Sequence, residues 1–245
     1  MLQRRSFACI IPAKGISTRV PGKNMQVCDG YPLVAYPFKI AQEAGIFDTM
    51  LLSTDSREIL DYAKLFSYDY PYLRPDELAT PESKVWDAVR DMLTYIELNN
   101  PELVTDFVCL LHPTNPCLKP QSVRAAMSAM LRSRFFACSS FTKVSPYTTR
   151  NLKKMLFRGP KDTRYDHPCY CLNGAITACR WRDAVRLPDF WLLKYVYPYI
   201  TPPSEAIDID TYEDLETAEA ILQWRRTHVK PEPPTEDGEP PTETV

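Results

Sequence analysis

Continuous apolar runs alternate with segments of helical periodicity along the first half of the chain. Three apolar runs lack the polar alternation of a half-exposed strand and predict strands buried on both faces, at residues 7–12, 49–53 and 106–111. Apolar residues recur at three- and four-residue spacing elsewhere, which predicts helices at 33–44, 56–66, 84–98 and 121–131. Strands that alternate with helices indicate right-handed βαβ units, and therefore an α/β fold with a mostly parallel sheet covered on both faces.

The alternation weakens in the second half of the chain. A β-prone run at 141–144 precedes Pro146 and several basic residues, so we expect residues 136–159 to leave the main sheet as a hairpin lid or a dimer arm. Strands are predicted again at 174–179 and 192–200. A final helix is predicted after residue 210 and should end near Arg226. Thr211 and Asp214 fit a capping box at its start, and its buried face carries Leu215, Ala218, Ile221 and Leu222.

Composition and charge limit the class of protein. The 29 Lys and Arg nearly balance the 31 Asp and Glu, which disfavours a generic nucleic-acid binder. No stretch approaches the roughly 20 apolar residues of a membrane span. The eight cysteines fall mostly in apolar runs without a metal-type spacing, so we expect reduced core residues in a cytoplasmic protein. Residues 229–245 contain five Pro and five acidic residues and are expected to form a disordered tail.

The segment after the first predicted strand, residues 12–24, is called here the cationic loop. Three cations lie within ten of its residues, Lys14, Arg19 and Lys23, together with Gly15 and Ser17. Backbone amides after a buried strand can cradle phosphate oxygens while the cations neutralise them. The segment is neither a Walker A loop nor a GxGxxG turn, and a solvated basic loop has a similar composition. Both interpretations stay open on composition alone.

Asp208 and Asp210 form a second candidate site. In an extended segment, residues two apart project to the same side, so both carboxylates can meet one hard divalent cation while Ile207 and Ile209 enter the core. The alternative is that Asp210 caps the following helix and Asp208 is a surface charge. The cationic loop favours the metal interpretation, because a phosphate cradle and a carboxylate pair are the two halves of a nucleotidyl-transfer site.

Residues 10–24 resemble the nucleotide-binding signature of the cytidylyltransferases that activate sialic acids and related ulosonic acids with CTP. The resemblance continues in the same order at 53–55, 73–79, 110–116, 173–176 and 207–211. It implies a doubly wound, Rossmann-like α/β nucleotidyltransferase fold over residues 1–228, with a small inserted β arm at about 136–170 that forms a homodimer. The implied reaction couples CTP to a 2-keto-3-deoxy sugar acid and releases pyrophosphate.

The resemblance also implies roles for individual residues. Lys14, which stands where the family has an arginine, and Lys23 would contact the triphosphate, and Asp208 and Asp210 would hold Mg²⁺ or Mn²⁺; these four are the catalytic candidates. Nucleotide contacts would also come from Gly15, Ser17, Arg19, Asn24, Arg74 and Ser83, of which Ser17 and Arg19 match the loop of the Kdo cytidylyltransferases. The sugar acid would meet His112, Asn173 and Arg164, with Lys143 as a further candidate for its carboxylate.

Departures from the family pattern lie mainly on the sugar side. Lys14 keeps the positive charge but loses the planar fork of arginine. His112 stands where the sialic-acid enzymes carry glutamine, and Thr177 where a tyrosine is common. We therefore expect a related acidic sugar rather than N-acetylneuraminic acid itself. The alternatives are a nucleotidyltransferase of the same fold for another sugar or nucleotide, and a non-catalytic nucleotide-binding relative.

Overall fold

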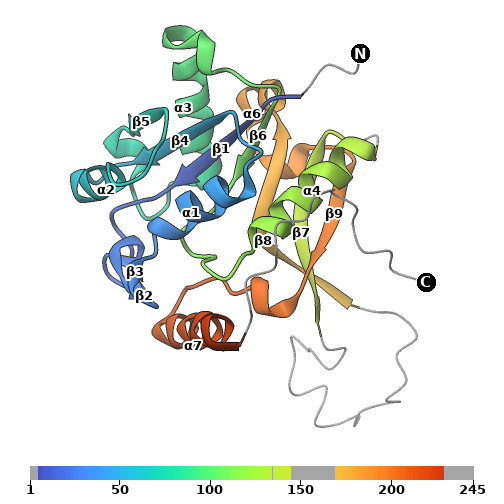
Figure 1. Ribbon diagram of the computed structural model, residues 1–245. Coiled ribbons are helices and arrows are strands. Elements are labelled where there is room, and N and C mark those ends of the chain that lie inside the picture. The colour runs from blue at the N-terminus through green and yellow to red at the C-terminus, as the bar shows by residue number, and fades with distance from the viewer. Residues whose placement is uncertain (1–4, 134, 145–168, 229–245) are drawn as a thin grey trace, which may run out of the picture.

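A computed structural model describes residues 5–133, 135–144 and 169–228 of the chain. Within these residues a seven-stranded sheet has the order β5-β4-β1-β6-β8-β7-β9 (Figure 1). Its strands are β1 (Phe7–Pro12), β4 (Thr49–Thr54), β5 (Tyr70–Leu73), β6 (Phe107–Leu110), β7 (Ala137–Val144), β8 (Cys169–Arg180) and β9 (Val196–Thr201). Neighbouring strands run parallel from β5 through β4 and β1 to β6, whereas β8 runs antiparallel to β6 and β7. The predicted mostly parallel α/β sheet is confirmed.

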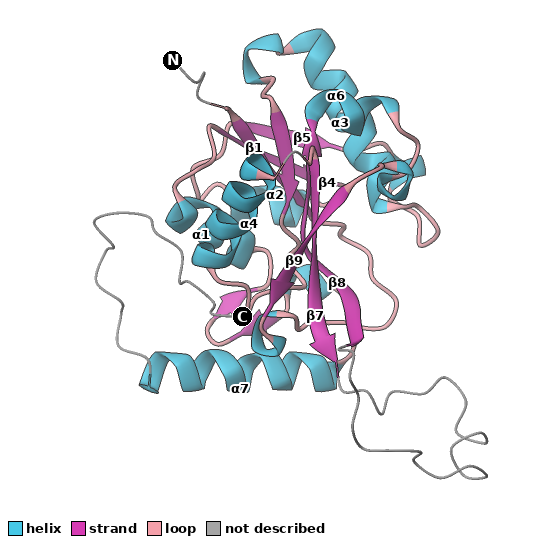
Figure 2. Ribbon diagram, turned by 90° about the vertical axis from the view of Figure 1, so that its right-hand side faces the viewer, coloured by secondary structure: helices cyan, strands magenta, loops and turns pink. Residues whose placement is uncertain are grey.

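Helices cover both faces of the sheet, as Figure 2 shows with α1 and α4 on one side and α3 on the other. The helices are α1 (Ala35–Ala44), α2 (Arg57–Ala63), α3 (Val85–Asn99), α4 (Pro120–Arg132), α6 (Trp181–Arg186) and α7 (Tyr212–His228). Alternate residues of β1 enter opposite layers: Ile11 packs in the core with α1 and α4, and Ile10 packs with α3. Burial on both faces explains why this strand is apolar throughout.

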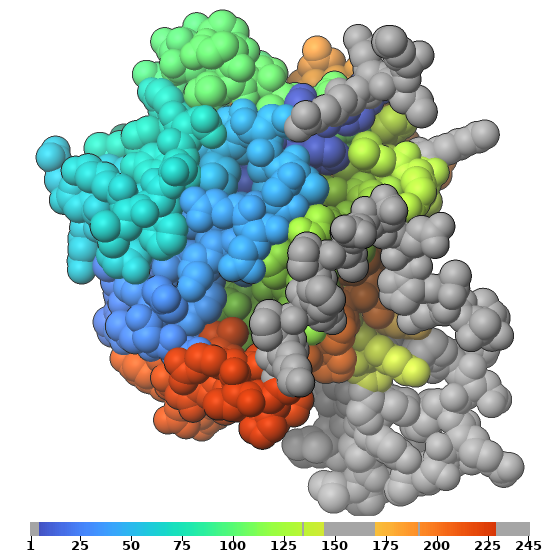
Figure 3. Space-filling view, viewed as in Figure 1, coloured from blue at the N-terminus to red at the C-terminus, as the bar shows by residue number. Residues whose placement is uncertain are grey.

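Short elements complete the described fold. A two-stranded hairpin joins β2 (Val27–Cys28) to β3 (Tyr31–Pro32), and 3-10 turns occur at Lys23–Met25, Asp76–Leu78, Pro101–Leu103, Phe190–Leu192 and Pro203–Glu205. The hairpin lies against α7, where Asp29 pairs with Arg226 at 3.2 Å. In the space-filling view, the blue part of the surface adjoins the red part that belongs to α7 (Figure 3). This packing fixes α7 beside the cationic loop that precedes the hairpin.

Two predictions about the second half of the chain need correction. Residues 137–144 do not leave the main sheet, because β7 lies inside it, between β8 and β9. The strand predicted at 192–200 begins only at Val196, after a 3-10 turn. The rest of the predicted β arm falls on residues 145–168, and the predicted tail on 229–245; both lie outside the described residues, so the arm, its homodimer and the tail stay predictions.

The β2–β3 hairpin, strand β5 and helix α6 were not predicted. The edge strand β5 contains Pro71, which is typical of a sheet edge because proline cannot donate to a ladder. Helix α6 is only six residues long and follows β8 directly. Of the cysteines described, Cys9, Cys28, Cys109, Cys117, Cys138 and Cys179 are buried free thiols as expected, whereas Cys171 is exposed. No helix within the described residues is long and apolar enough to cross a bilayer.

Candidate functional site

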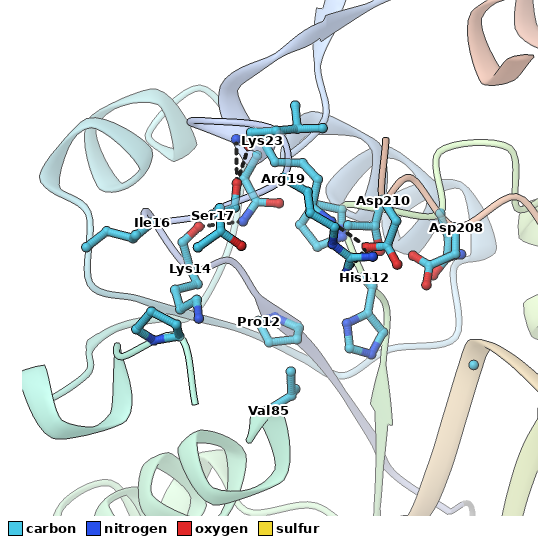
Figure 4. Close-up of a pocket in the computed structure, with 18 of the residues that line it drawn as sticks. Pro12, Lys14, Ile16, Ser17, Arg19, Lys23, Val85, His112, Asp208 and Asp210 are labelled. Carbon is cyan, nitrogen blue, oxygen red and sulfur yellow. Dashed lines mark hydrogen bonds and ion pairs between the residues drawn. The ribbon is translucent and has the colours of Figure 1, made fainter. Parts of the chain in front are cut away.

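A cavity of about 460 Å³ opens at the carboxyl ends of β1 and β6. The cationic loop forms one side, and the segment that precedes α7 forms the other (Figure 4). The predicted residues that line it are Lys14, Ser17, Arg19, Lys23, Asn24, His112, Asn173, Asp208 and Asp210. Groups almost two hundred positions apart in sequence therefore share one cavity, at the strand ends where open α/β sheets bind their ligands.

The Asp210 carboxylate meets two cations of the cationic loop. Its Oδ1 atom lies 2.8 Å from Arg19 Nη2 and 3.1 Å from Lys23 Nζ. Lys23 Nζ also donates to the carbonyl of Ile209 at 2.6 Å, so its ammonium is fixed against this segment. Figure 4 shows Arg19 extended toward Asp210, with Asp208 and His112 beside it. The cationic loop is therefore held to the aspartate segment by charge, which a solvated basic loop is not.

The capping box predicted at the start of α7 is present. Thr211 N–H donates to Asp214 Oδ2 at 2.8 Å, and Asp214 N–H donates to Thr211 Oγ1 at 3.2 Å. Asp214 Oδ2 also accepts the N–H of Asp210 at 3.0 Å. Because Thr211 and Asp214 cap the helix, the interpretation of Asp210 as the capping residue is wrong. Its carboxylate is free to face the cavity while its backbone is held by the cap.

Asp208 lies on the same side of the segment as Asp210. Ile209 between them is fully buried, and its N–H donates to the carbonyl of Thr114 at 2.9 Å. Asn115 Nδ2 donates to the carbonyl of Ile207 at 3.0 Å. These hydrogen bonds hold residues 207–210 against the loop after β6. The isoleucines pack in the core and the aspartates line the cavity, which confirms the predicted alternation.

The aspartate pair can supply two oxygen ligands to a divalent metal. Asp208 is exposed, and within the described residues its carboxylate has neither an ion pair nor a hydrogen bond. No set of three or more His, Cys, Asp or Glu suited to a metal occurs in the described part of the chain. Mg²⁺ is commonly held by one or two carboxylates, with substrate phosphates and water completing its shell. The donor set therefore fits Mg²⁺ better than a metal that needs a complete protein cage.

His112 follows β6 and is half-buried in the cavity. Burial lowers the pKa of its imidazole below the usual histidine value; Asp208 opposes this shift, and Lys23 adds to it. The lowered pKa favours the neutral imidazole, in which one nitrogen donates and the other accepts. A neutral imidazole suits contact with an uncharged hydroxyl or amide of a ligand.

Hydrogen bonds within the cationic loop set its shape. Ser17 Oγ donates to the carbonyl of Val20 and accepts the N–H of Lys23 at 3.2 Å. Asn24 Nδ2 donates to the carbonyl of Lys14 at 2.7 Å, while Lys14 Nζ donates to the carbonyl of Thr80 at 2.9 Å. Ser17 and Asn24 thus brace the loop, and their predicted nucleotide contacts stay predictions.

Gly15 is required by a close approach of the loop to the segment after β4. Its N–H donates to Asp55 Oδ1 at 2.8 Å, and a Cβ added to it would lie 2.8 Å from Ser56 Cβ. Asp55 belongs to a block that matches the family pattern, but sequence reasoning gave it no role. Asn115 was likewise given no role, although it lies in the block at 110–116 that matches the family pattern.

Of the predicted site residues that the structure describes, four do not line the cavity: Gly15, Arg74, Ser83 and Lys143. Arg74 is buried, donates from Nη2 to the carbonyl of Ser53 at 2.7 Å, and its Nε has no partner within the described part of the chain. Burial lowers its pKa, and Asp55 opposes the shift. Ser83 donates to the carbonyl of Glu77 at 2.9 Å. Lys143 is exposed on β7, and Arg164 lies outside the described residues.

The sequence model of the family described as cytidylyltransferase matches residues 8–228. CMP-N,N'-diacetyllegionaminic acid synthase of Legionella pneumophila is 29% identical over 222 residues, covering 87% of this chain and 95% of that protein. Pseudaminic acid cytidylyltransferase of Campylobacter jejuni is 29% identical over 227 residues, covering 88% and 95%. A solved structure of CMP:2-keto-3-deoxy-manno-octonic acid synthetase complexed with CTP superposes with a TM-score of 0.66 at 14% identity, covering 90% of this chain and 99% of that one. The superposition supports the nucleotidyltransferase fold.

Proposed function

The chain belongs to the cytidylyltransferase family, and we propose that it couples CTP to a 2-keto-3-deoxy sugar acid of the ulosonic type, giving a CMP-sugar and pyrophosphate. One observation carries the proposal: the cationic loop and the aspartate pair face each other across one cavity and meet at Asp210. The relatives named above act on acids of this type according to their names, and they match nearly the full described fold. His112 and the altered sugar side favour a sialic-acid-like substrate other than N-acetylneuraminic acid.

The proposed reaction forms one bond and breaks one at the α-phosphorus of CTP. The anomeric hydroxyl oxygen of the sugar acid attacks, the bond from this phosphorus to the β-phosphate oxygen breaks, and the hydroxyl proton passes to solvent. Phosphoryl chemistry of this kind depends on alignment and charge stabilisation. Lys14, Arg19 and Lys23 would bind the triphosphate and stabilise the charge that grows on the leaving pyrophosphate.

Asp208 and Asp210 would hold the Mg²⁺ (or Mn²⁺) that nucleotidyl transfer uses. A bound divalent ion neutralises phosphate charge and lowers the pKa of a coordinated hydroxyl. Arg19 and Lys23 both form ion pairs with Oδ1 of Asp210. The triphosphate offers these two cations a more highly charged partner, so its arrival would release Asp210. His112, neutral and adjacent to Asp208, would contact the sugar acid, as would Asn173 and Arg164.

We also propose that the protein is a cytoplasmic homodimer. The buried free thiols support a reducing compartment; burial raises the pKa of Cys117, for example, to about 11, which keeps it protonated and inert. The dimer rests on the family resemblance and on the segment predicted to form the arm. Sedimentation velocity of the full chain and of a variant lacking residues 145–168 tests it, with a dimer expected only for the full chain.

Pyrophosphate release tests the proposed activity directly. CTP, ATP, GTP and UTP are each supplied with Mg²⁺ and with legionaminic, pseudaminic, N-acetylneuraminic or 2-keto-3-deoxy-manno-octonic acid. We expect release with CTP and at least one of these acids. Release with another nucleotide would support a different transferase of the same fold, and CTP binding without release under any pair would support a non-catalytic relative.

Single substitutions test the roles of the aspartates. Asp208→Asn and Asp210→Asn keep the side-chain size but remove the charge, and each is expected to lose most turnover while circular dichroism stays unchanged. Asp61→Asn is the matched control, because Asp61 is exposed on α2 and pairs only with Lys64 among the described residues. Near-normal turnover of Asp210→Asn at saturating Mg²⁺ would remove these carboxylates from the mechanism.

A further inference from the structure

The ladder between β7 and β8 is interrupted beside the cavity. Ser139 pairs with Thr177, and Phe141 pairs with Leu172. Ser140 alone therefore faces four residues of β8, 173–176, which form a large bulge. Leu110 at the end of β6 also pairs with Thr177, so the bulge begins where β6 ends and His112 follows. Residues 173 and 174 of the bulge line the cavity.

Side chains replace the backbone bonds that the bulge removes. Ser140 Oγ donates to Asn173 Oδ1 at 2.5 Å and accepts the N–H of Ile176 at 2.9 Å. Asn173 Oδ1 also accepts the N–H of Ala175 at 3.1 Å, and its Nδ2 donates to Thr201 Oγ1 at 2.7 Å. Thr201 Oγ1 in turn donates to the carbonyl of Phe141 at 3.1 Å. One brace thus joins β7, β8 and β9.

The brace fixes what the bulge presents to the cavity. Ser140 and Thr201 are 0% and 1% exposed, so their hydroxyls have no access to a ligand. The Asn173 oxygen already accepts two hydrogen bonds, which leaves one Nδ2 hydrogen without a partner among the described residues. Gly174 has φ +67°, and a Cβ there would meet only open space. The bulge therefore offers amide groups and a hollow instead of side-chain charge.

These properties fit a polar, uncharged part of the second substrate. The cations that line the cavity come from the cationic loop, which we assigned to the triphosphate, whereas the bulge supplies uncharged hydrogen-bonding groups on the side of the cavity where His112 lies. Hydroxyl and N-acyl groups of a sugar have the matching chemistry. The bulge belongs to β8, whereas the cationic loop follows β1. A substitution that displaces the bulge can therefore leave the cationic loop in place.

We propose that Ser140 and Thr201 are positioning residues for the sugar-acid subsite, and that they act by holding the bulge of residues 173–176 in place. The inference rests on the proposed function, because it assigns one side of the same cavity to the second substrate. It also changes the role of Asn173: its side chain is chiefly a structural tie, and the ligand meets the backbone of Gly174 and the single remaining amide hydrogen.

Ser140→Ala and Thr201→Val remove one hydroxyl each with little change in volume. Each hydroxyl makes two hydrogen bonds in the brace, and we expect their loss to raise the KM for the sugar acid about tenfold in each variant. The KM for CTP should stay within about twofold of the unaltered protein. Thr201→Ser keeps the hydroxyl, so its KM for the sugar acid should equal that of the unaltered protein and not that of Thr201→Val.

Ser139→Ala is the matched control. Ser139 is also fully buried on β7, but its hydroxyl has no hydrogen-bond partner within the described residues. Ser139→Ala should therefore leave the KM values for the sugar acid and for CTP unchanged. If Ser140→Ala fails to fold, as judged by thermal unfolding, Thr201→Val with its Thr201→Ser rescue gives the same test from β9.

The outcomes separate this inference from the proposed function. If the unaltered protein releases pyrophosphate but the variants raise both KM values equally, raise neither, or behave like Ser139→Ala, the positioning role is refuted and the activity stands. If the unaltered protein releases no pyrophosphate with any sugar acid, the proposed function fails, and the assignment of the subsite fails with it.

Discussion

Replacement of Arg19 by alanine should strengthen the binding of a divalent metal to the nucleotide-free protein. Arg19 Nη2 lies 2.8 Å from Asp210 Oδ1, the oxygen that also accepts from Lys23. A metal that coordinates this oxygen must displace the guanidinium. Metal binding therefore costs the free energy of the ion pair. Without Arg19 this cost is absent, so the metal should bind more tightly.

The expected gain in metal affinity can be estimated from the solvent exposure of the ion pair. The Arg19 side chain is 64% exposed and that of Asp210 is 39% exposed, so the pair belongs to the solvent-screened class. Exposed ion pairs contribute about 0.2–1 kcal/mol. At 1.4 kcal/mol for each tenfold change, metal affinity should rise about 1.4- to 5-fold. With CTP bound, Arg19 is expected to contact phosphate, so the same substitution should then weaken nucleotide binding.

Titration with Mn²⁺, followed by the loss of the free-ion electron paramagnetic resonance signal, measures the affinity. Low ionic strength is needed because salt screens the pair. Lys14→Ala is the matched control: it removes a cation from the same cavity, but Lys14 donates to the carbonyl of Thr80 and not to Asp210. An effect of Arg19→Ala no larger than that of Lys14→Ala would refute the competition between the ion pair and the metal.

Three further predictions follow from the same contacts. Gly15→Ala places a Cβ 2.8 Å from Ser56 Cβ, so it should cost about 1–3 kcal/mol in urea unfolding and weaken CTP binding measured by calorimetry. Asp214→Ala removes the capping box of α7 and should lower the free energy of unfolding by about 0.5–2 kcal/mol, with weaker Mn²⁺ binding because the N–H of Asp210 loses its partner. His112→Gln tests pH dependence: because the folded pKa of His112 lies below the unfolded value of about 6.5, the unfolded chain takes up its proton first, and stability falls as the pH drops through this range. The variant should lose less stability between pH 7 and pH 5 than the unaltered protein in urea titrations, and equal losses would contradict this assignment.

Local patterns predicted the elements whose burial is uniform. The apolar run of β1 and the capping residues of α7 each carry their signal within a few positions, and both agree with the structure. Edge strand β5 gave no such signal, because it contains Pro71 and its outward residues are exposed. The run at 137–144 was placed outside the sheet because its partners, β8 and β9, lie much later in the chain.

The site was predictable as a set of charges but not as a set of contacts. The combination of a phosphate cradle and a carboxylate pair indicated that the cationic loop and the aspartates form one site, yet which carboxylate binds Arg19 depends on how α7 is capped. Sequence also gave no reason to link Ser140 with Asn173, since their bond exists only because of the register shift between β7 and β8. Arg74 is buried and donates to the carbonyl of Ser53, and its predicted contact with the nucleotide stays a prediction.

A crystal structure with CTP and Mn²⁺, with the metal located by its anomalous signal, tests the central claim most directly. The account predicts that the triphosphate lies in the cavity between the cationic loop and the segment before α7, with the anomalous peak at Asp208 and Asp210 and with Arg19 turned from Asp210 to phosphate. A triphosphate bound outside this cavity, or a metal peak away from both aspartates, would contradict it.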